Sequence, residues 1–424
     1  MNVSAVARAT AIDPVRWPDV AEVPRVSPAR VLIAERLVRR ALSRLPLRVR
    51  RPDGPDIGLG GPLLELRDPR AFHRRVAAHG LIGFGESYMA GEWEAEDLVG
   101  VLTVLAAHIA ELIPPPLQRL RALWAGRQPT SQRNTPDGSR ENIHRHYDLS
   151  NDLFGLFLDE TLSYSSALFR GFPASFAALP AAQHRKIDQL LDLAGVGPGT
   201  RLLEIGTGWG ELALRAASRG ATVVSVTLSA EQRELALRRI EAAGHADAVT
   251  VLLADYREVT GRYDAVVSVE MIEAVGAEFW PTYFRTLERL TVPGGRIAVQ
   301  AITMPHDRML ATRHTYTWIQ KYIFPGGFLP STTAVREVTE AHTALRLDRC
   351  DAFGAHYAET LRLWRERFTE RADEVGALGF DATFRRMWTF YLAYSEAGFR
   401  SGYLDVHHLL LTTPPPHDPQ EIPS

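Results

Sequence analysis

The sequence predicts an α/β fold built on a Rossmann-like parallel sheet, and two observations carry the prediction. From residue 142 onward, short runs rich in β-branched residues alternate with amphipathic helical runs. One of the strands also runs into a glycine-rich turn, "LLEIGTGWGELAL", at Leu202–Leu214. Alternating strands and helices form parallel sheets covered on both faces. Ligands of such sheets bind beyond the carboxyl ends of the strands, where this turn lies.

The individual elements follow from the period of the apolar residues. Strands are predicted at 200–206, 221–228, 249–255, 263–271 and 295–302, and a late strand at 402–414. Helices are predicted at 209–218, 229–243 and 279–290. The helical stretch 303–345 interrupts this order after the fifth strand. We expect this insertion to form a lid or a wall against the substrate.

The chain is long enough for two or three domains. Residues 1–24 are rich in Pro and Val without a period, and we expect them to be disordered. Residues 25–125 read as a small N-terminal accessory domain that ends in helices. The polar stretch 126–141 is predicted to be a linker, and residues 142–424 are predicted to form the main domain.

A basic segment, Arg25–Arg51, holds nine arginines and one acid, Glu35. On a helix, one side of this segment is apolar and the arginines lie on or beside the other; the apolar residues are Ala34, Leu37, Val38, Ala41 and Leu45. Such a helix can pack on its own domain with a solvated charged face. It can also lie on an anionic bilayer. The sequence leaves both interpretations open.

The bulk composition excludes several classes of protein. The net charge is −2, which argues against a nucleic-acid partner. The single cysteine, Cys350, excludes an intramolecular disulfide and a cysteine-based zinc site, so no metal is expected. The most apolar tract, Val99–Ile113, is too short to span a bilayer. We therefore expect a cytoplasmic protein, peripheral at the inner face of the membrane, and whether it forms a homo-oligomer is left open.

The glycine turn separates two classes of nucleotide site. A nicotinamide fingerprint needs its third glycine one residue later and an acid at the end of the second strand, where this chain has Thr227. An acid followed by G-x-G-x-G is the pattern of class I methyltransferases, which bind S-adenosylmethionine. The expected cofactor contacts are Glu204, Gly206, Gly208, Gly210 and, at the end of the third strand, Asp255 and Tyr256.

Several longer stretches resemble one enzyme family. They are "HYDLSNDLFGLFLDETLSYSSALF", "LLEIGTGWG", "VTLSAEQ", "WIQKYIFPGGFLPS", "FGAHYAETLRLWRERF" and the accessory-domain stretch "GFGESYMAGEWEAEDL". They are similar to cyclopropane-fatty-acyl-phospholipid synthases and mycolic acid methyltransferases over residues 60–412. The resemblance implies a class I methyltransferase domain at 142–424. It also implies methyl transfer from S-adenosylmethionine to the cis double bond of an unsaturated phospholipid, with an oleoyl chain expected.

The resemblance also assigns residues. It implies cofactor contacts from Tyr164, Ser165, Thr227, Leu228 and Gln232. In the family a bicarbonate ion acts as the base, and its expected ligands here are Ser166, Glu273, Gln300, Ile302 and Tyr357. Two of these depart from the family, because Ser166 replaces a cysteine and Gln300 a histidine. We therefore expect that bicarbonate is not strictly needed, and that a carboxylate or water held by Glu273 and Tyr357 can take the proton.

The chemistry of an alkene explains what such a site needs. Methyl attack leaves a carbocation, so the site must be dry, and aromatic faces can stabilise the charge; the candidates are Tyr164, Phe169, Trp318, Tyr322, Phe324, Tyr357, Trp388 and Tyr391. Immediate loss of a proton from the new methyl group closes a cyclopropane. A prior hydride shift gives a methylene branch instead.

The two departures and the stretches "VEMIEAVG" and "YTWIQKYIFPGG" favour the methylene product. The stretches resemble the actinobacterial branch that makes 10-methylene lipids, precursors of tuberculostearic acid. A cyclopropane synthase is the alternative. More remote alternatives are a small-molecule or protein methyltransferase and a non-catalytic lipid-binding or cofactor-binding protein.

Overall fold

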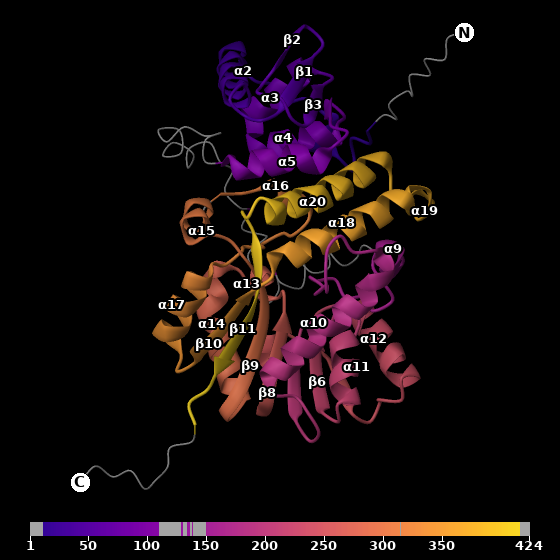
Figure 1. The fold of residues 1–424 in the computed structure, drawn as a ribbon, viewed down its shortest axis with the longest axis vertical. Coiled ribbons are helices and arrows are strands. Elements are labelled where there is room, and N and C mark those ends of the chain that lie inside the picture. The colour runs from indigo at the N-terminus through magenta and orange to yellow at the C-terminus, as the bar shows by residue number, and fades with distance from the viewer. Residues whose placement is uncertain are drawn as a thin grey trace, which may run out of the picture. The chain divides into compact units, whose positions relative to one another are not determined.

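A computed structural model describes residues 12–109, 129, 134, 135, 138, 150–313 and 315–415. The chain forms two compact units (Figure 1). The first comprises Met1–Gly126, Thr315–Trp318 and Phe368–Ala397, and the second comprises Arg127–His314, Ile319–Arg367 and Gly398–Ser424. Most of the predicted linker, and residues 1–11 of the segment expected to be disordered, lie outside the described residues.

The first unit contains a four-stranded sheet in the order β2-β1-β3-β4. Its strands are β1 (Arg48–Arg51), β2 (Gly54–Ile57), β3 (Leu63–Leu66) and β4 (Trp93–Glu94). Its N-terminal helices are α1 (Pro18–Ala21), α2 (Pro28–Leu42), α3 (Pro69–His79), α4 (Leu81–Met89) and α5 (Leu98–Ala107). The side chains of Asp68 and Asp97 accept hydrogen bonds from backbone N–H groups in the first turns of α3 and α5, which fixes where these helices begin.

Two late helices, α19 (Ala372–Ala377) and most of α20 (Ala382–Arg400), also belong to the first unit. Arg386 Nε on α20 donates to the Tyr88 carbonyl at 2.7 Å. Trp17 Nε1 donates to Asp381 Oδ2 at 2.8 Å. The segment 368–397 therefore packs with N-terminal residues, whereas the sequence places it in the main domain. Residues 12–24, which were expected to lack order, include α1.

The second unit contains a seven-stranded sheet in the order β10-β11-β9-β8-β5-β6-β7. The strands are β5 (Arg201–Ile205), β6 (Thr222–Thr227), β7 (Val249–Leu253), β8 (Tyr263–Val269), β9 (Thr291–Thr303), β10 (Arg346–Ala352) and β11 (Asp405–Thr412). The first five of these run parallel, and β11 lies antiparallel between β9 and β10. The five predicted parallel strands and the late strand are confirmed, and β10 is an addition that the sequence pattern did not predict.

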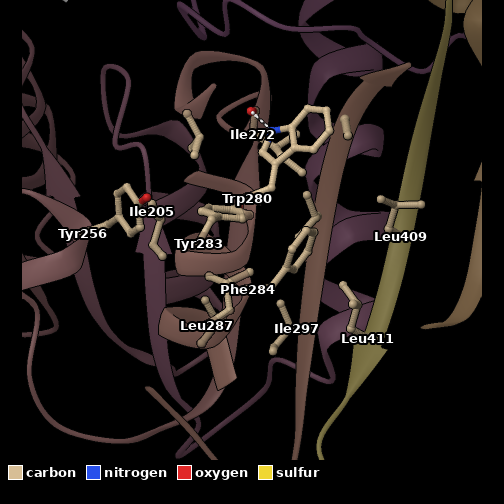
Figure 2. Close-up of a cluster of buried hydrophobic side chains, with 14 of the residues drawn as sticks. Ile205, Tyr256, Ile272, Trp280, Tyr283, Phe284, Leu287, Ile297, Leu409 and Leu411 are labelled. Atoms are coloured by element: carbon tan, nitrogen blue, oxygen red, sulfur yellow. Dashed lines mark hydrogen bonds between the residues drawn. The ribbon is translucent and has the colours of Figure 1, made fainter. Parts of the chain in front are cut away.

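Helices cover both faces of this sheet, as the alternating pattern predicts. One face is covered by α10 (Leu179–Ala194), α11 (Glu211–Ser218) and α12 (Ala230–Ala242). The other is covered by α14 (Trp280–Leu290) and α17 (Thr332–His342). Figure 2 shows the core on the α14 side, where the Trp280 indole N–H donates to the Ile272 carbonyl. Strand β5 serves both cores because its side chains alternate: Leu202 faces α10 and Leu203 faces α14.

The remaining helices of the second unit are α9 (Asn151–Phe157), α13 (Ile272–Val275), α15 (His306–Thr312), and most of α16 (Trp318–Tyr322) and of α18 (Gly354–Glu370). The predicted insertion 303–345 consists of α15, α16 and α17. Its last helix, α17, buries Ala334 and Val335 in the core beneath the sheet. Among the described residues, no helix combines the length and apolar character that crossing a membrane would need.

Candidate active site

The glycine turn lies at the carboxyl end of β5, as predicted. Gly206, Gly208 and Gly210 all have positive φ values, of 98°, 51° and 91°, a region that favours glycine. A Cβ added to Gly206 would meet Met271 Cγ at 2.8 Å, whereas a Cβ added to Gly208 would meet no atom within 4 Å. The turn therefore packs tightly on one side and leaves open space at Gly208. That space fits the close approach of S-adenosylmethionine.

Polar side chains fix the strand ends around this turn. Ser225 Oγ on β6 donates to Glu204 Oε2 at 2.5 Å. Thr227 Oγ1 donates to the Gln232 side-chain carbonyl at 3.0 Å. Leu228, between them in the chain, is half-buried. The predicted second-strand contacts are thus brought together at one edge of the sheet, beside the glycine turn.

Asp255 is placed as predicted, just beyond β7, but it is already engaged. Its two oxygens accept from Arg257 Nε at 2.8 Å and Nη2 at 2.6 Å. Tyr256 is buried, and its ring packs edge-on against Tyr283 with centroids 5.6 Å apart. The Arg257 guanidinium also lies over the Tyr256 ring, at 5.4 Å from its centroid. The sequence analysis did not identify Arg257, which contacts both of these expected cofactor residues.

The segment 164–166 is held by a buried lysine. Lys186 Nζ on α10 donates to Ser165 Oγ at 2.6 Å. Burial lowers the Lys186 pKa to about 8, and its strongest favourable charge neighbour is Glu270. The Tyr164 ring packs among Phe154, Phe157 and Trp364. Lys186 is one of two lysines in the chain, which was the available signal that its position is unusual.

Glu273 lies at the start of α13, just past β8. Its Oε1 accepts the backbone N–H of Ile302 at 2.5 Å. Its Oε2 is buried and has no hydrogen-bond partner among the described residues. Burial, followed by the charge of Glu270, raises the pKa of Glu273 to about 8. Glu273 is therefore hydrogen-bonded to Ile302, another of the residues expected to hold the bicarbonate ion, and Glu273 holds a proton at neutral pH.

The central residue of the site is Glu270, which the sequence analysis did not identify. Its side chain is half-buried, and its carboxylate accepts three hydrogen bonds. Oε1 accepts from the Ser166 backbone N–H at 3.0 Å and from Gln300 Nε2 at 2.7 Å. Oε2 accepts from the Tyr357 hydroxyl at 2.7 Å. Three of the five residues expected to hold a bicarbonate ion thus hold a carboxylate of the chain itself.

Ser166 differs from its expected role in one respect. Its hydroxyl points away from Glu270 and donates to the Ala167 carbonyl at 3.1 Å. Only the backbone N–H of Ser166 reaches the carboxylate. The replacement of the family's cysteine by Ser166 therefore does not change the group that contacts the Glu270 carboxylate, which is a backbone N–H.

Gln300, which donates to Glu270, is itself hydrogen-bonded to a histidine. His408 Nε2 on β11 lies 3.0 Å from Gln300 Oε1. Because Gln300 Nε2 faces a carboxylate, its Oε1 is the acceptor, and His408 must donate through Nε2. Burial lowers the His408 pKa to about 3, so this imidazole stays neutral. His408 orients Gln300 and supplies no charge of its own.

The aromatic candidates are divided between the units. Tyr357 contacts Glu270 directly, and its ring packs against Phe399 with centroids 4.7 Å apart. Phe169 stacks with His356 at 6.3 Å between centroids. Trp318, Trp388 and Tyr391 belong to the first unit. The remaining candidates, Tyr164, Tyr322 and Phe324, belong to the second unit together with Phe169 and Tyr357.

Comparisons with known proteins identify the family of the chain. The family model described as mycolic acid cyclopropane synthetase matches residues 134–409. The tuberculostearic acid methyltransferase UfaA1 of Mycobacterium tuberculosis is 57% identical over 410 residues, which cover 95% of this chain and 96% of the relative. The cyclopropane-fatty-acyl-phospholipid synthase of Escherichia coli is 35% identical over 334 residues, covering 78% and 82%.

The solved structures give the same fold. Mycolic acid cyclopropane synthase CmaA1, in a complex with SAH and CTAB, matches with a TM-score of 0.59 and 32% identity. The match covers 65% of this chain and 98% of that chain. The cyclopropane synthase MmaA2 from Mycobacterium tuberculosis matches with the same TM-score, identity and coverage. The second unit therefore has the class I methyltransferase fold that the sequence predicts.

Proposed function

The chain belongs to the mycolic acid cyclopropane synthetase family, and we propose that it adds a one-carbon unit to the cis double bond of an unsaturated phospholipid acyl chain. The product we propose is a 10-methylene branch. The observation that carries the proposal is 57% identity, across 95% of the chain, to a relative named for tuberculostearic acid. The 35% identity to a cyclopropane synthase makes ring closure the second candidate.

The test is lipid analysis in a host that makes oleoyl phospholipids but no branched chains. The two products are isomers, so their masses are equal. Oxidative cleavage distinguishes them, because it cuts the C=C bond of the methylene branch and leaves a cyclopropane intact. We expect cleavage at carbon 10. Uncleaved product with the added carbon would establish the cyclopropane, and unmodified lipid would contradict the function.

S-adenosylmethionine is the cofactor, and it supplies an electrophilic methyl group when bound. We propose that the glycine turn and Thr227 hold it, since Gly208 faces open space at the carboxyl end of β5. Ser165, fixed by Lys186, lies on the same side as Glu270, because the next residue, Ser166, donates its N–H to that carboxylate. This arrangement positions the methyl donor beside the acidic residues.

We also propose that the first unit reaches its phospholipid through α2. Three large apolar side chains of this helix are exposed: Leu32, Ile33 and Leu37. Exposed arginines lie among them, at Arg36 and Arg40. The sequence analysis places Leu37 on the apolar side of this helix, and the structure leaves its side chain exposed. A helix face with both apolar and cationic groups suits the interface of an anionic bilayer.

Sedimentation with vesicles tests the contact. We expect the protein to bind vesicles that contain phosphatidylglycerol more strongly than vesicles of phosphatidylcholine alone. Replacing Leu32, Ile33 and Leu37 with serine should weaken this binding by at least about tenfold, since each side chain loses apolar area to bury. Leu253→Ser is the control, because Leu253 is equally exposed but lies on β7 of the second unit. Equal binding by the triple variant would contradict the proposal.

A further inference from the structure

The hydrogen-bond donors around Glu270 favour the ionised form of its side chain. This side chain is half-buried, and all three of its hydrogen-bond partners donate to it. A protonated carboxyl would need an acceptor, whereas an ionised one accepts at both oxygens. Hydrogen bonds to the charged form offset the cost of burial. The donor set around Glu270 therefore selects the carboxylate.

The hydrogen bonds also leave one acceptor position open. A carboxylate has about four lone-pair positions, two on each oxygen. Oε1 uses both of its positions, for the Ser166 N–H and Gln300 Nε2. Oε2 accepts only from Tyr357 among the described residues. The second lone pair of Oε2 is thus the place where Glu270 can receive a proton.

The backbone at Glu270 is strained. Its φ is +50°, and Leu162 is the other non-glycine residue with a positive φ in the described part of the chain. A glutamate in this region is disfavoured, and such strain persists where the surroundings impose it, commonly at functional sites. The Glu270 N–H donates to the Gln300 carbonyl at 2.8 Å, which helps to hold this conformation. A glycine here would relieve the strain but would remove the carboxylate.

The nearby charges separate the roles of the two acids. Burial raises the pKa of Glu270, and the hydrogen bonds from Tyr357, Ser166 and Gln300, together with the charge of buried Lys186, act against that rise. Glu273 carries a pKa of about 8 and is neutral at pH 7. Its proton removes the repulsion that two carboxylates would exert on each other. Of the two acids, Glu270 is therefore the one whose donors and neighbouring Lys186 favour the ionised form.

We propose that the Glu270 carboxylate is the catalytic base of this enzyme and that it takes the place of a bicarbonate ion. This inference rests on the proposed function. After methyl attack and the hydride shift, a C–H bond of the transferred methyl group breaks. The electron pair of this C–H bond forms the double bond of the methylene branch, and the proton goes to Glu270 Oε2. The sulfonium leaves as a thioether, and the proton passes to solvent once the product departs, so the reaction releases one proton overall.

Two substitutions at Glu270 test the base directly. Glu270→Gln keeps the shape but cannot accept the proton, and we expect turnover to fall by about 10²-fold or more. Glu270→Gly relieves the positive φ and opens a space the size of a small carboxylate. Its activity should be equally low in degassed buffer and should recover at least about tenfold with added bicarbonate or formate. Wild type should not respond to either anion.

Further measurements separate loss of the base from loss of the fold. Calorimetric affinity for S-adenosylmethionine should stay within about threefold in both variants, and bicarbonate should bind measurably only to Glu270→Gly. Glu234→Gln, an exposed carboxylate on α12, is the control and should match wild type. Near-normal turnover of Glu270→Gln, a strong bicarbonate dependence of wild type, or no rescue of Glu270→Gly would each overturn the inference. A wild type that modifies no lipid would instead contradict the proposed function.

Discussion

Glu273 differs from Glu270 in its charge, and the difference leads to a prediction. Because Glu273 is neutral at pH 7, a glutamine mimics its working form and can still accept the Ile302 N–H. We expect Glu273→Gln to lower kcat/KM by less than about tenfold, far less than loss of a general base. The acid limb of the pH profile should not move, since Glu273 is already protonated there. A 100-fold loss or a displaced limb, measured from pH 5 to 7.5, would show that Glu273 works as a carboxylate.

Gly208 gives a second prediction. A side chain at this position points into open space, so Gly208→Asp should leave the fold intact, and aspartate tolerates positive φ better than most residues. The carboxylate would occupy the proposed cofactor space and repel the carboxylate of methionine. Calorimetry should show at least about 100-fold weaker binding of S-adenosylmethionine. Gly244→Asp is a matched control, since Gly244 also has positive φ and open space. Normal binding by Gly208→Asp would place the cofactor elsewhere.

The sequence located most of this site but not its central carboxylate. Glu273, Gln300, Ile302 and Tyr357 were identified by motif, and the structure brings them together with Glu270. The stretch "VEMIEAVG" contains both acids, yet only the fold shows which one meets Tyr357. The available signal was Glu270 itself, a charged residue directly after a buried strand. Its pairing depends on the register of β8 with β9, in which Val269 faces Gln300, and a sequence pattern does not fix register.

Helix α14 illustrates what periodicity predicts well. Its apolar residues recur on one face and bury Trp280, Tyr283, Phe284, Leu287 and Leu290 in the core. Leu287, labelled in Figure 2, has no exposed surface. We expect Leu287→Ala to lower the free energy of unfolding by about 2–5 kcal/mol, measured by denaturant unfolding. Leu253→Ala, at a half-exposed leucine on β7, should change it by less than about 0.5 kcal/mol. Equal effects would mean that the α14 face is not the core.

Strand β10 shows where periodicity fails. Its sequence, RLDRCDA, is polar, and most of its side chains are exposed or half-buried. It lies at the edge of the sheet and pairs with β11 alone, so it needs no apolar face to remain in place. Backbone hydrogen bonds to β11 and the packing of Leu347 against the core hold it in place. The sequence analysis assigns α20 to the main domain for a different reason. The contacts of α20 with residues almost 300 positions earlier in the chain leave no trace in a local sequence pattern.

Across the whole chain, buried ionisable groups link stability to pH. Burial raises the pKa values of Glu204 and Glu273 to about 8. In the unfolded chain these groups titrate near 4.5, so between pH 4.5 and 8 the folded chain holds protons that the unfolded chain has released. Stability therefore falls as pH rises through this window. Burial lowers the His408 pKa to about 3, so His408 makes stability rise with pH. This rise is complete near pH 6.5, where a free histidine titrates.

Between pH 6.5 and 8 the change in stability therefore reports on the two acids. Lys186 has the opposite effect on stability, but only above its pKa of about 8. We expect the free energy of unfolding to decrease steadily across this interval, by at most about 1.4 kcal/mol per pH unit for each acid. Glu204→Gln removes one of these protons and should make the decrease shallower, whereas the exposed Glu234→Gln should reproduce the wild-type slope. Denaturant midpoints at pH 6.5, 7, 7.5 and 8 measure the slopes. A stability that is constant or rises over this interval would mean that Glu204 and Glu273 are ionised in the folded chain, and the neutral state assigned to Glu273 beside Glu270 would be wrong with it.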